Sequence, residues 1–261
     1  MEAGPRLHDY IHELPGCWQP GPGAAAPVQP PRLPGGEADP LLRGVSDAAG
    51  AVSGWWASLF RDCGSGEKPG GLELTARAAE LCGFGPGSRL LDVAAGNGGT
   101  VRFLRERFAC QVSGLDSDPV RQCPEVALGR AEELPFPDRA FDGVLIECAL
   151  SQIDRPEEVL GECARVLKPG GHLVLSDLYA GQGGGAATPL GRLDSREEVE
   201  ERLDRAGLEP VLFEDHTGLL TSLWASAMMA GEGCALAEAL RGPDWPQGVK
   251  TGYYLCIARN M

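Results

Sequence analysis

The sequence predicts an α/β fold in which helices cover both faces of a largely parallel sheet. From about residue 71 onward, short apolar segments alternate with segments whose apolar residues recur at helical spacing. The apolar segments are nearly continuous, as in strands that are buried on both faces. A chain of 261 residues is long enough for one such domain with additional elements.

The first elements of this domain surround a glycine-rich turn. Leu72–Cys82 has helical spacing, and Gly83 follows it at the position where many helices end in a left-handed residue. Arg89–Val93 is an apolar strand. Gly99–Phe108 is a helix that begins directly after the glycines, and the apolar segment Gln111–Leu115 is the next strand.

The rest of the chain continues the alternation. Further strands are predicted at Val126–Gly129, Asp142–Glu147, His172–Asp177, Pro210–Asp215 and Gly252–Ala258. Helices are predicted at Arg155–Leu167, at Asp194–Ala206 and over most of Leu219–Leu240. We expect Asp154 to cap the first of these helices and either Asp194 or Ser195 to cap the second, which ends at Gly207.

The residues before this domain fall into two segments. Residues 1–44 are predicted to be a flexible arm, because proline and glycine are dense from Pro15 to Pro40. Residues 45–70 are predicted to form a helical lid, since Trp55 and Trp56 belong to an apolar stripe at helical spacing. This stripe either packs on the main domain, residues 71–261, or covers a pocket, and the two interpretations are compatible.

Charge and composition exclude several classes of partner. The formal net charge is −14, and no basic cluster interrupts it, so we expect neither nucleic acid nor an anionic membrane surface as a partner. The sequence has neither a signal-peptide pattern nor an apolar run long enough to span a membrane, which predicts a cytoplasmic protein. Its nine cysteines are scattered without metal-binding spacing, so we expect reduced thiols and no metal site.

The segment Leu90–Thr100, LLDVAAGNGGT, is the most informative part of the sequence. It places a bare-backbone turn at the C-terminal end of a buried strand, where open α/β sheets bind small ligands. The helix that follows offers unpaired N–H groups to such a ligand. Dinucleotide-binding turns have a third glycine where this chain has Val101, and here Asp92 precedes the turn. Both features disfavour a nicotinamide cofactor.

The turn resembles the first motif of class I S-adenosylmethionine-dependent methyltransferases. The residues that match are Asp92, Ala94, Gly96 and Gly98. Asp116 at the end of the next strand, the segment GRAEELPFPDRAFDGVLIE (129–147) and the segment LKPGGHLVLSD (167–177) extend the resemblance. It covers residues 72–177 well and is closest to the ubiquinone/menaquinone-biosynthesis and arsenite methyltransferase-like subgroup.

The resemblance implies a Rossmann-like sheet of seven strands, mostly parallel, whose last strand is antiparallel and preceded by a helical insertion at about 217–241. It implies S-adenosylmethionine as the co-substrate. The residues that would bind it are Asp92, Ala94, Ala95, Gly96 and Gly98 at the methionine end, Asp116 at the ribose, and Ala131 with Glu132 at the adenine. This chain departs from the family at Ala94, where a glycine is usual, and at Arg130, where many relatives have an acid. We expect the change at Ala94 to be modest, because alanine tolerates right-handed conformations.

The resemblance also places Glu147 and Cys148 opposite the methyl group that is transferred. Glu147 is either a base or a substrate-orienting residue, or else a partly solvated acid at a strand end. Cys148 either binds a metalloid, as a matching cysteine does in arsenite methyltransferases, or is a small residue lining the pocket. His216 either reaches the acceptor or caps the next helix.

The predicted function is therefore methyl transfer to a small molecule. Tryptophans in the lid and the apolar stripe that includes Leu220 and Trp224 favour an acceptor with apolar bulk. A metalloid or thiol methyltransferase that uses Cys148 is one alternative, and a non-catalytic accessory protein that binds the cofactor is another. The sequence leaves the oligomeric state open.

Overall fold

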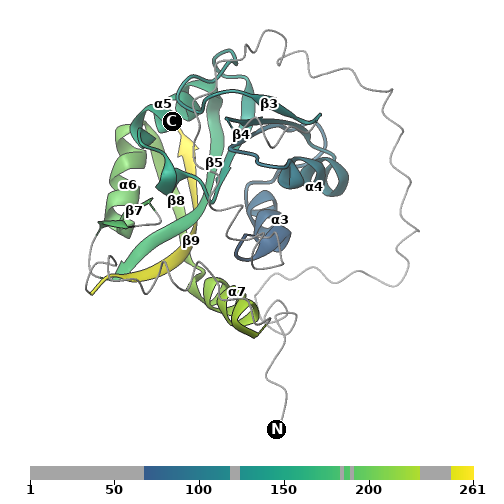
Figure 1. The fold of residues 1–261 in the computed structure, drawn as a ribbon. Helices are drawn as coiled ribbons and strands as arrows, with labels where there is room; N and C mark the ends of the chain where they lie inside the picture. The colour runs from purple at the N-terminus through teal and green to yellow at the C-terminus, as the bar shows by residue number, and fades with distance from the viewer. Residues whose placement is uncertain (1–67, 118–123, 183–184, 189–190, 230–247) are drawn as a thin grey trace. The chain divides into compact units, whose positions relative to one another are not determined.

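The computed structural model describes residues 68–117, 124–182, 185–188, 191–229 and 248–261. The predicted arm, residues 1–44, lies outside the described residues. So does the predicted lid up to residue 67, with Trp55 and Trp56. Figure 1 shows the described elements with the labels used below.

The predicted seven-stranded sheet is confirmed. Its strands are β1 (Arg89–Val93), β2 (Gln111–Asp116), β3 (Val126–Leu128), β4 (Phe141–Glu147), β5 (Leu167–Gln182), β8 (Leu208–Asp215) and β9 (Lys250–Asn260). They lie in the order β3-β2-β1-β4-β5-β9-β8. The first five are parallel to one another, and β9 runs antiparallel to both β5 and β8. The last strand is thus the antiparallel one, as predicted.

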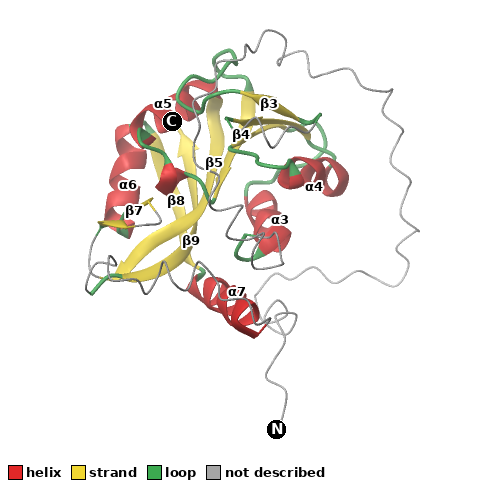
Figure 2. Ribbon diagram, in the orientation of Figure 1, coloured by secondary structure: helices red, strands yellow, loops and turns green. Residues whose placement is uncertain are grey.

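Helices cover both faces of this sheet, as the apolar strands predicted (Figure 2). The helices are α3 (Gly71–Leu81), α4 (Gly99–Phe108), α5 (Pro156–Val166), α6 (Arg196–Arg205) and α7 (Thr217–Met229). One buried cluster joins strand residues to α5 and α6 through Leu160 and Leu203. A second cluster joins the opposite face to α3, α4 and α7 through Leu74, Leu104 and Leu220. Because successive side chains of a strand point to opposite faces of the sheet, neighbouring residues of one strand belong to different clusters.

Several boundaries differ from the prediction. The helix expected from Arg155 starts at Pro156, and its N-cap residue Arg155 makes no side-chain capping bond, so the prediction that Asp154 caps it is wrong. This helix ends at Val166, and β5 begins at the next residue, Leu167. Strand β5 is ten residues longer than the strand predicted at His172–Asp177. The next helix is capped by Ser195 through a complete capping box with Glu198.

Two features were not predicted from the sequence. Strands β6 (Ala186–Thr188) and β7 (Gly191–Leu193) form a small antiparallel hairpin between β5 and α6. A short 3-10 helix, η3 (Leu150–Gln152), follows β4. Gly191 has φ of 99°, and a Cβ there would meet the Ser151 carbonyl, so the hairpin approaches η3 as closely as a glycine allows. Helix α7 lies between β8 and β9, where an insertion was expected, and residues 230–247 lie outside the described part.

Candidate functional site

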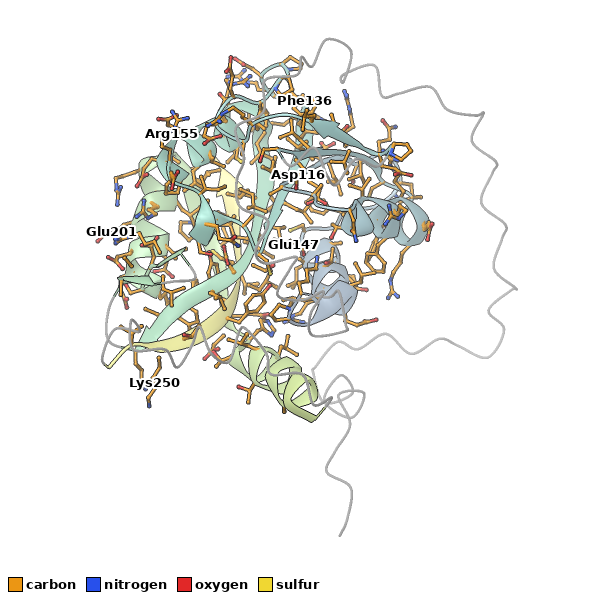
Figure 3. The ribbon with its side chains drawn as sticks, viewed as in Figure 1. Asp116, Phe136, Glu147, Arg155, Glu201 and Lys250 are labelled. Atoms are coloured by element: carbon orange, nitrogen blue, oxygen red, sulfur yellow. The ribbon has the colours of Figure 1, made fainter. Side chains whose placement is uncertain are left out.

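Polar side chains gather on one face of the sheet at the C-terminal ends of its parallel strands. Asp116, Asp92, Glu147 and Ser176 occupy this edge on the neighbouring strands β2, β1, β4 and β5, and Tyr253 joins them from β9. Side-chain alternation places them on the face that packs against α3 and α4. Figure 3 labels Asp116 and Glu147 among these side chains.

The glycine-rich turn links β1 to β2 through its backbone. The Ala95 N–H donates to the Leu115 carbonyl at 3.1 Å, and the Gly96 N–H donates to Oδ2 of Asp116 at 2.8 Å. Gly96 and Gly98 have φ of 54° and 73°, which glycine adopts without steric cost. Asp92, the turn and Asp116 therefore lie together at this edge of the sheet, while their role in binding a cofactor stays a prediction.

Ala94 corrects one expectation. We expected a right-handed conformation that alanine tolerates, but its φ is 59°, in the left-handed region. A non-glycine residue there costs about 1–2 kcal/mol, since its Cβ crowds the neighbouring carbonyl oxygen. Ala94 thus adopts a backbone conformation that glycine would adopt without cost, and the backbone at this residue is locally strained.

Asp92 is a buried acid with an unsatisfied oxygen. Its residue is 3 % exposed, and its Oδ2 has no hydrogen-bond partner in the described part of the chain. Burial raises the pKa of Asp92 well above its ordinary value; the nearby charges of Glu147 and Asp116 raise it further, and Lys68 opposes them. A buried acceptor of this kind favours a donor that carries positive charge.

Glu147 is held by three donors. Thr75 Oγ1 donates to its Oε1 at 2.8 Å, Thr100 Oγ1 donates to its Oε2 at 2.8 Å, and Lys68 forms an ion pair with Oε2. The Glu147 side chain is only 6 % exposed. The interpretation as a partly solvated acid at a strand end is therefore wrong. An ammonium and two hydroxyls already engage this carboxylate, an arrangement that favours an orienting role.

Cys148 is a partly buried thiol in a short hydrogen-bonded chain. Its Sγ lies 3.0 Å from Oη of Tyr253, which in turn donates to Oγ of Ser176 at 3.2 Å. Burial raises the pKa of the Cys148 thiol, and Asp177 raises it further. Since metalloids are bound by thiolates, this environment does not favour the metalloid interpretation. Cys148 has φ of 55°, so the chain turns sharply directly after β4.

The His216 ring pairs with Glu214, and only the His216 backbone N–H reaches this cluster in the described part, where it donates to the Tyr253 carbonyl at 2.7 Å. Nε2 of the ring lies 2.9 Å from Oε2 of Glu214, and Glu214 also pairs with Arg77 on α3. His216 directly precedes α7, and its carbonyl accepts from the Leu219 N–H at 2.8 Å, while the Asp215 carboxylate accepts from the Thr217 N–H at 2.7 Å. His216 fastens the start of α7 to β8 and α3.

The predicted adenine-binding residues lie next to Asp116 in the fold. The Gly129 N–H donates to the Asp116 carbonyl at 2.9 Å, which ties the segment after β3 to the end of β2. The Glu132 carboxylate is 3.0 Å from Arg130 and 3.6 Å from Arg155, so its charge is already neutralised by two arginines. Ala131 packs against the core beneath.

A cavity of about 330 Å³ lies on the other face of the sheet, between η3, α5, α6 and β7. Its lining residues include none of the predicted cofactor-binding residues. Asp177 contributes to its wall and accepts hydrogen bonds from the Ser151 N–H at 2.8 Å and the Ser151 hydroxyl at 3.0 Å. We therefore assign Asp177 the structural role of fixing η3 to β5.

Asp177 is expected to make the free energy of unfolding depend on pH. Burial raises its pKa to about 6, above the ordinary value of about 3.9, so the folded chain binds this proton more tightly than the unfolded chain. The resulting stability is present below about pH 4 and is lost as the pH rises towards 6. Relative to Asp177→Asn, the wild type should lose about 2–3 kcal/mol over this range in urea unfolding. A constant difference between the two proteins contradicts the prediction.

Lys68, Thr75 and Thr100 were not predicted from the sequence. Thr100 carried a visible signal, since it stands at the start of the helix that follows the glycines. Lys68 carried none, because it is 79 residues from Glu147 and the two meet only when α3 packs beside β4. No group of three metal-binding side chains occurs in the described ranges.

Residues 91–175, from β1 to the middle of β5, match the family model of a methyltransferase domain. This segment of the chain is therefore similar to a methyltransferase domain. The match includes the glycine-rich turn, Asp92, Asp116 and Glu147. It covers the part of the chain on which the predicted resemblance rested.

Curated relatives and solved structures agree with this domain. The chain is 33% identical to a demethylmenaquinone methyltransferase from Tropheryma whipplei over 112 residues, which are 38% of this chain and 46% of that protein. The chain thus spans under half the length of that relative. A crystal structure of geranyl diphosphate C-methyltransferase from Streptomyces coelicolor matches the methyltransferase fold with a TM-score of 0.58 at 18% identity, over 73% of this chain and 81% of that one.

The same fold also serves another reaction. The [4+2]-cyclase SpnF matches with a TM-score of 0.61 at 24% identity, over 72% of this chain and 80% of that chain. Likeness at this level establishes the fold alone. None of the helices in the described ranges has the length and apolarity needed to cross a membrane.

Proposed function

We propose that this chain binds S-adenosylmethionine at the glycine-rich turn and transfers its methyl group to a small molecule. One observation carries the proposal: the Gly96 N–H donates to Asp116 close to Asp92, whose buried Oδ2 has no hydrogen-bond partner among the described residues. This arrangement fits the cofactor, because its methionine end carries an ammonium and its ribose offers two hydroxyls. Curated relatives with this domain are named as methyltransferases of small molecules.

Each residue of the site has a defined part in the proposal. Asp116 accepts hydrogen bonds from the ribose hydroxyls, and the turn from Ala94 to Gly98 lets the ligand lie against backbone. Asp92 attracts the ammonium of the methionine end. Ala131 and Glu132 contact the adenine through their backbone, since two arginines already engage the Glu132 carboxylate.

The bound cofactor supplies a methyl group attached to a positively charged sulfur. When the methyl group is transferred, the sulfur leaves as a neutral thioether, which is a good leaving group. The protein then needs chiefly to hold the acceptor in line and exclude water. Tyr253 and Ser176 are buried beside the end of β4 and are hydrogen-bonded in a chain with the partly buried Cys148. Because the carboxylate of Glu147 is engaged by three donors, it orients neighbouring groups instead of removing a proton from the acceptor.

We propose an acceptor with apolar bulk. The support comes from the apolar composition of residues 45–60 and of α7, whose Leu220 packs into the core below the site. Geranyl diphosphate and demethylmenaquinone, named for relatives above, are acceptors of this type. The cytoplasmic location expected from the sequence stays a prediction, and the oligomeric state is left open.

Two measurements test this function. Calorimetry with S-adenosylhomocysteine, the demethylated product, should detect one site per chain. Incubation with isotopically labelled S-adenosylmethionine and a panel of quinols, prenyl compounds and fatty acids should transfer label to at least one of them. Binding without transfer to any acceptor favours an accessory protein that binds the cofactor. Absence of binding overturns the proposal.

A further inference from the structure

The cavity between η3, α5, α6 and β7 is large enough for a small organic molecule. Its volume is about 330 Å³, and its apolar wall includes the buried side chains of Leu160 from α5, Leu175 from β5 and Leu203 from α6. Binding pockets of proteins begin at about 300 Å³, and an apolar cavity of about 150 Å³ is enough for benzene. A compound with one or two rings therefore fits this space.

Tyr254 of β9 also lines this cavity and carries a hydroxyl without a hydrogen-bond partner among the described residues. The residue is 2 % exposed, and its ring stacks on Phe213 and makes an edge contact with Tyr179, with ring centroids 5.0 Å and 5.7 Å apart. Burial raises the pKa of Tyr254, and the charges of Asp177 and Asp194 raise it further, so the hydroxyl keeps its proton. A buried O–H donor without an acceptor costs free energy, and a ligand oxygen in the cavity supplies that acceptor.

The charged groups of the cavity wall are either paired or exposed to solvent, so the cavity favours a neutral ligand. They are Asp154, Glu157, Asp177, Asp194, Arg192 and Arg202. Asp194 accepts from Nε of Arg192 at 2.6 Å and from Nε of Arg202 at 2.7 Å, and Arg202 also pairs with Glu157. Asp177 is held by η3, as described above, and the remaining acid is exposed. An anion would meet more acids than arginines, and a cation would meet carboxylates that these partners already engage.

We propose that this cavity is a second small-molecule site, which binds a neutral compound of one or two rings with an oxygen that accepts a hydrogen bond from Tyr254. The oxygen is a carbonyl or a hydroxyl, and the rings lie against the three leucines. The inference goes beyond the proposed function, because none of the residues proposed to bind S-adenosylmethionine lines this cavity. Helices α5 and α6 form its walls, whereas the glycine-rich turn leads into α4 on the other face of the sheet.

The experiment compares α-tetralone, a ketone of two fused rings, with tetralin, the hydrocarbon that lacks the oxygen. Dissociation constants are measured by NMR titration for the wild type, Tyr254→Phe and Tyr253→Phe. Tyr253 is the matched control, because it precedes Tyr254 on β9, points to the opposite face and donates its hydroxyl hydrogen to Ser176. The wild type and the control should prefer the ketone about fivefold, as one net hydrogen bond allows. In Tyr254→Phe the two dissociation constants should agree within about twofold.

Stability distinguishes a ligand-binding hydroxyl from a structural one. Tyr254→Phe removes a group without a partner in the described part of the chain, so its free energy of unfolding in urea should equal or exceed that of the wild type. Tyr253→Phe loses the hydrogen bond to Ser176 and should be less stable. A clear loss of stability in Tyr254→Phe means that the hydroxyl has a structural task, and it overturns the proposal.

Three measurements locate the bound compound and test its charge. Val199→Phe enlarges a side chain of the cavity wall and should abolish binding of both compounds. Saturating S-adenosylhomocysteine should leave binding of α-tetralone unchanged, because the two sites share no residue. A tetralin carboxylate should bind at least about tenfold more weakly than the ketone, since the cavity offers its charge no free cation.

The outcomes separate the two proposals. The second site is wrong if the wild type binds neither compound, if it binds both equally, or if Tyr254→Phe keeps the preference for the ketone. It is also wrong if S-adenosylhomocysteine displaces the ketone or if the carboxylate binds as tightly. Ketone binding with the expected preference, in a chain that does not bind S-adenosylhomocysteine, overturns the proposed function and supports the second site.

Discussion

Replacing Asp116 with alanine is expected to weaken binding of S-adenosylhomocysteine by about 100-fold or more. A carboxylate that accepts from both ribose hydroxyls makes two charge-assisted hydrogen bonds, each worth about 1.5–3 kcal/mol. The substitution also removes the acceptor of the Gly96 N–H and so loosens the turn. Calorimetry or equilibrium dialysis measures the loss.

The control for this variant is Asp138→Ala. Asp138 lies before β4, at the opposite edge of the sheet, and its side chain is 73 % exposed and paired with Arg165. It should bind the ligand as the wild type does. If Asp116→Ala binds as tightly as Asp138→Ala, the ribose assignment is wrong and the site must be sought elsewhere.

Replacing Asp92 with asparagine is expected to stabilise the fold while weakening ligand binding about tenfold or more. Burial penalises the charged form of this carboxylate, whose Oδ2 has no hydrogen-bond partner among the described residues, and asparagine carries no charge. Asparagine is neutral and removes the repulsion from Glu147 and Asp116. Because the pKa of Asp92 is raised in the folded chain, the gain in unfolding free energy should be absent near pH 4 and should grow as the pH rises.

Urea unfolding at several pH values, with calorimetry of ligand binding, measures both effects. Asp142→Asn is the contrasting variant. Although Asp142 is partly buried, hydrogen bonds from Lys168 and the Arg89 N–H lower its pKa, so its removal should not stabilise the chain. A destabilised Asp92→Asn, or one that binds S-adenosylhomocysteine normally, contradicts the view that Asp92 is kept for the ligand at a cost in stability.

The sequence did not predict features that depend on which groups pack against a residue. Asp154 is a good capping residue by type, yet the chain enters α5 through Arg155 without a side-chain cap. Glu147 was correctly placed at the end of its strand, but a solvated environment was one of its expected states. The three donors that hold it come from the segment before α3, from α3 itself and from α4, and their approach is set by the core on that face of the sheet.

The sequence by itself determined the alternation of strands and helices, the antiparallel last strand implied by the resemblance, and the meeting of Asp92, the glycine turn and Asp116. These features follow from local periodicity and from the rule that parallel strands end at one edge. Only the tertiary structure decided that Ala94 is left-handed and that Lys68 neutralises Glu147. The ion pair joins residues 79 positions apart in the chain, which no local pattern encodes. The φ of Ala94 is one that alanine does not prefer by itself, so residue type alone did not predict it.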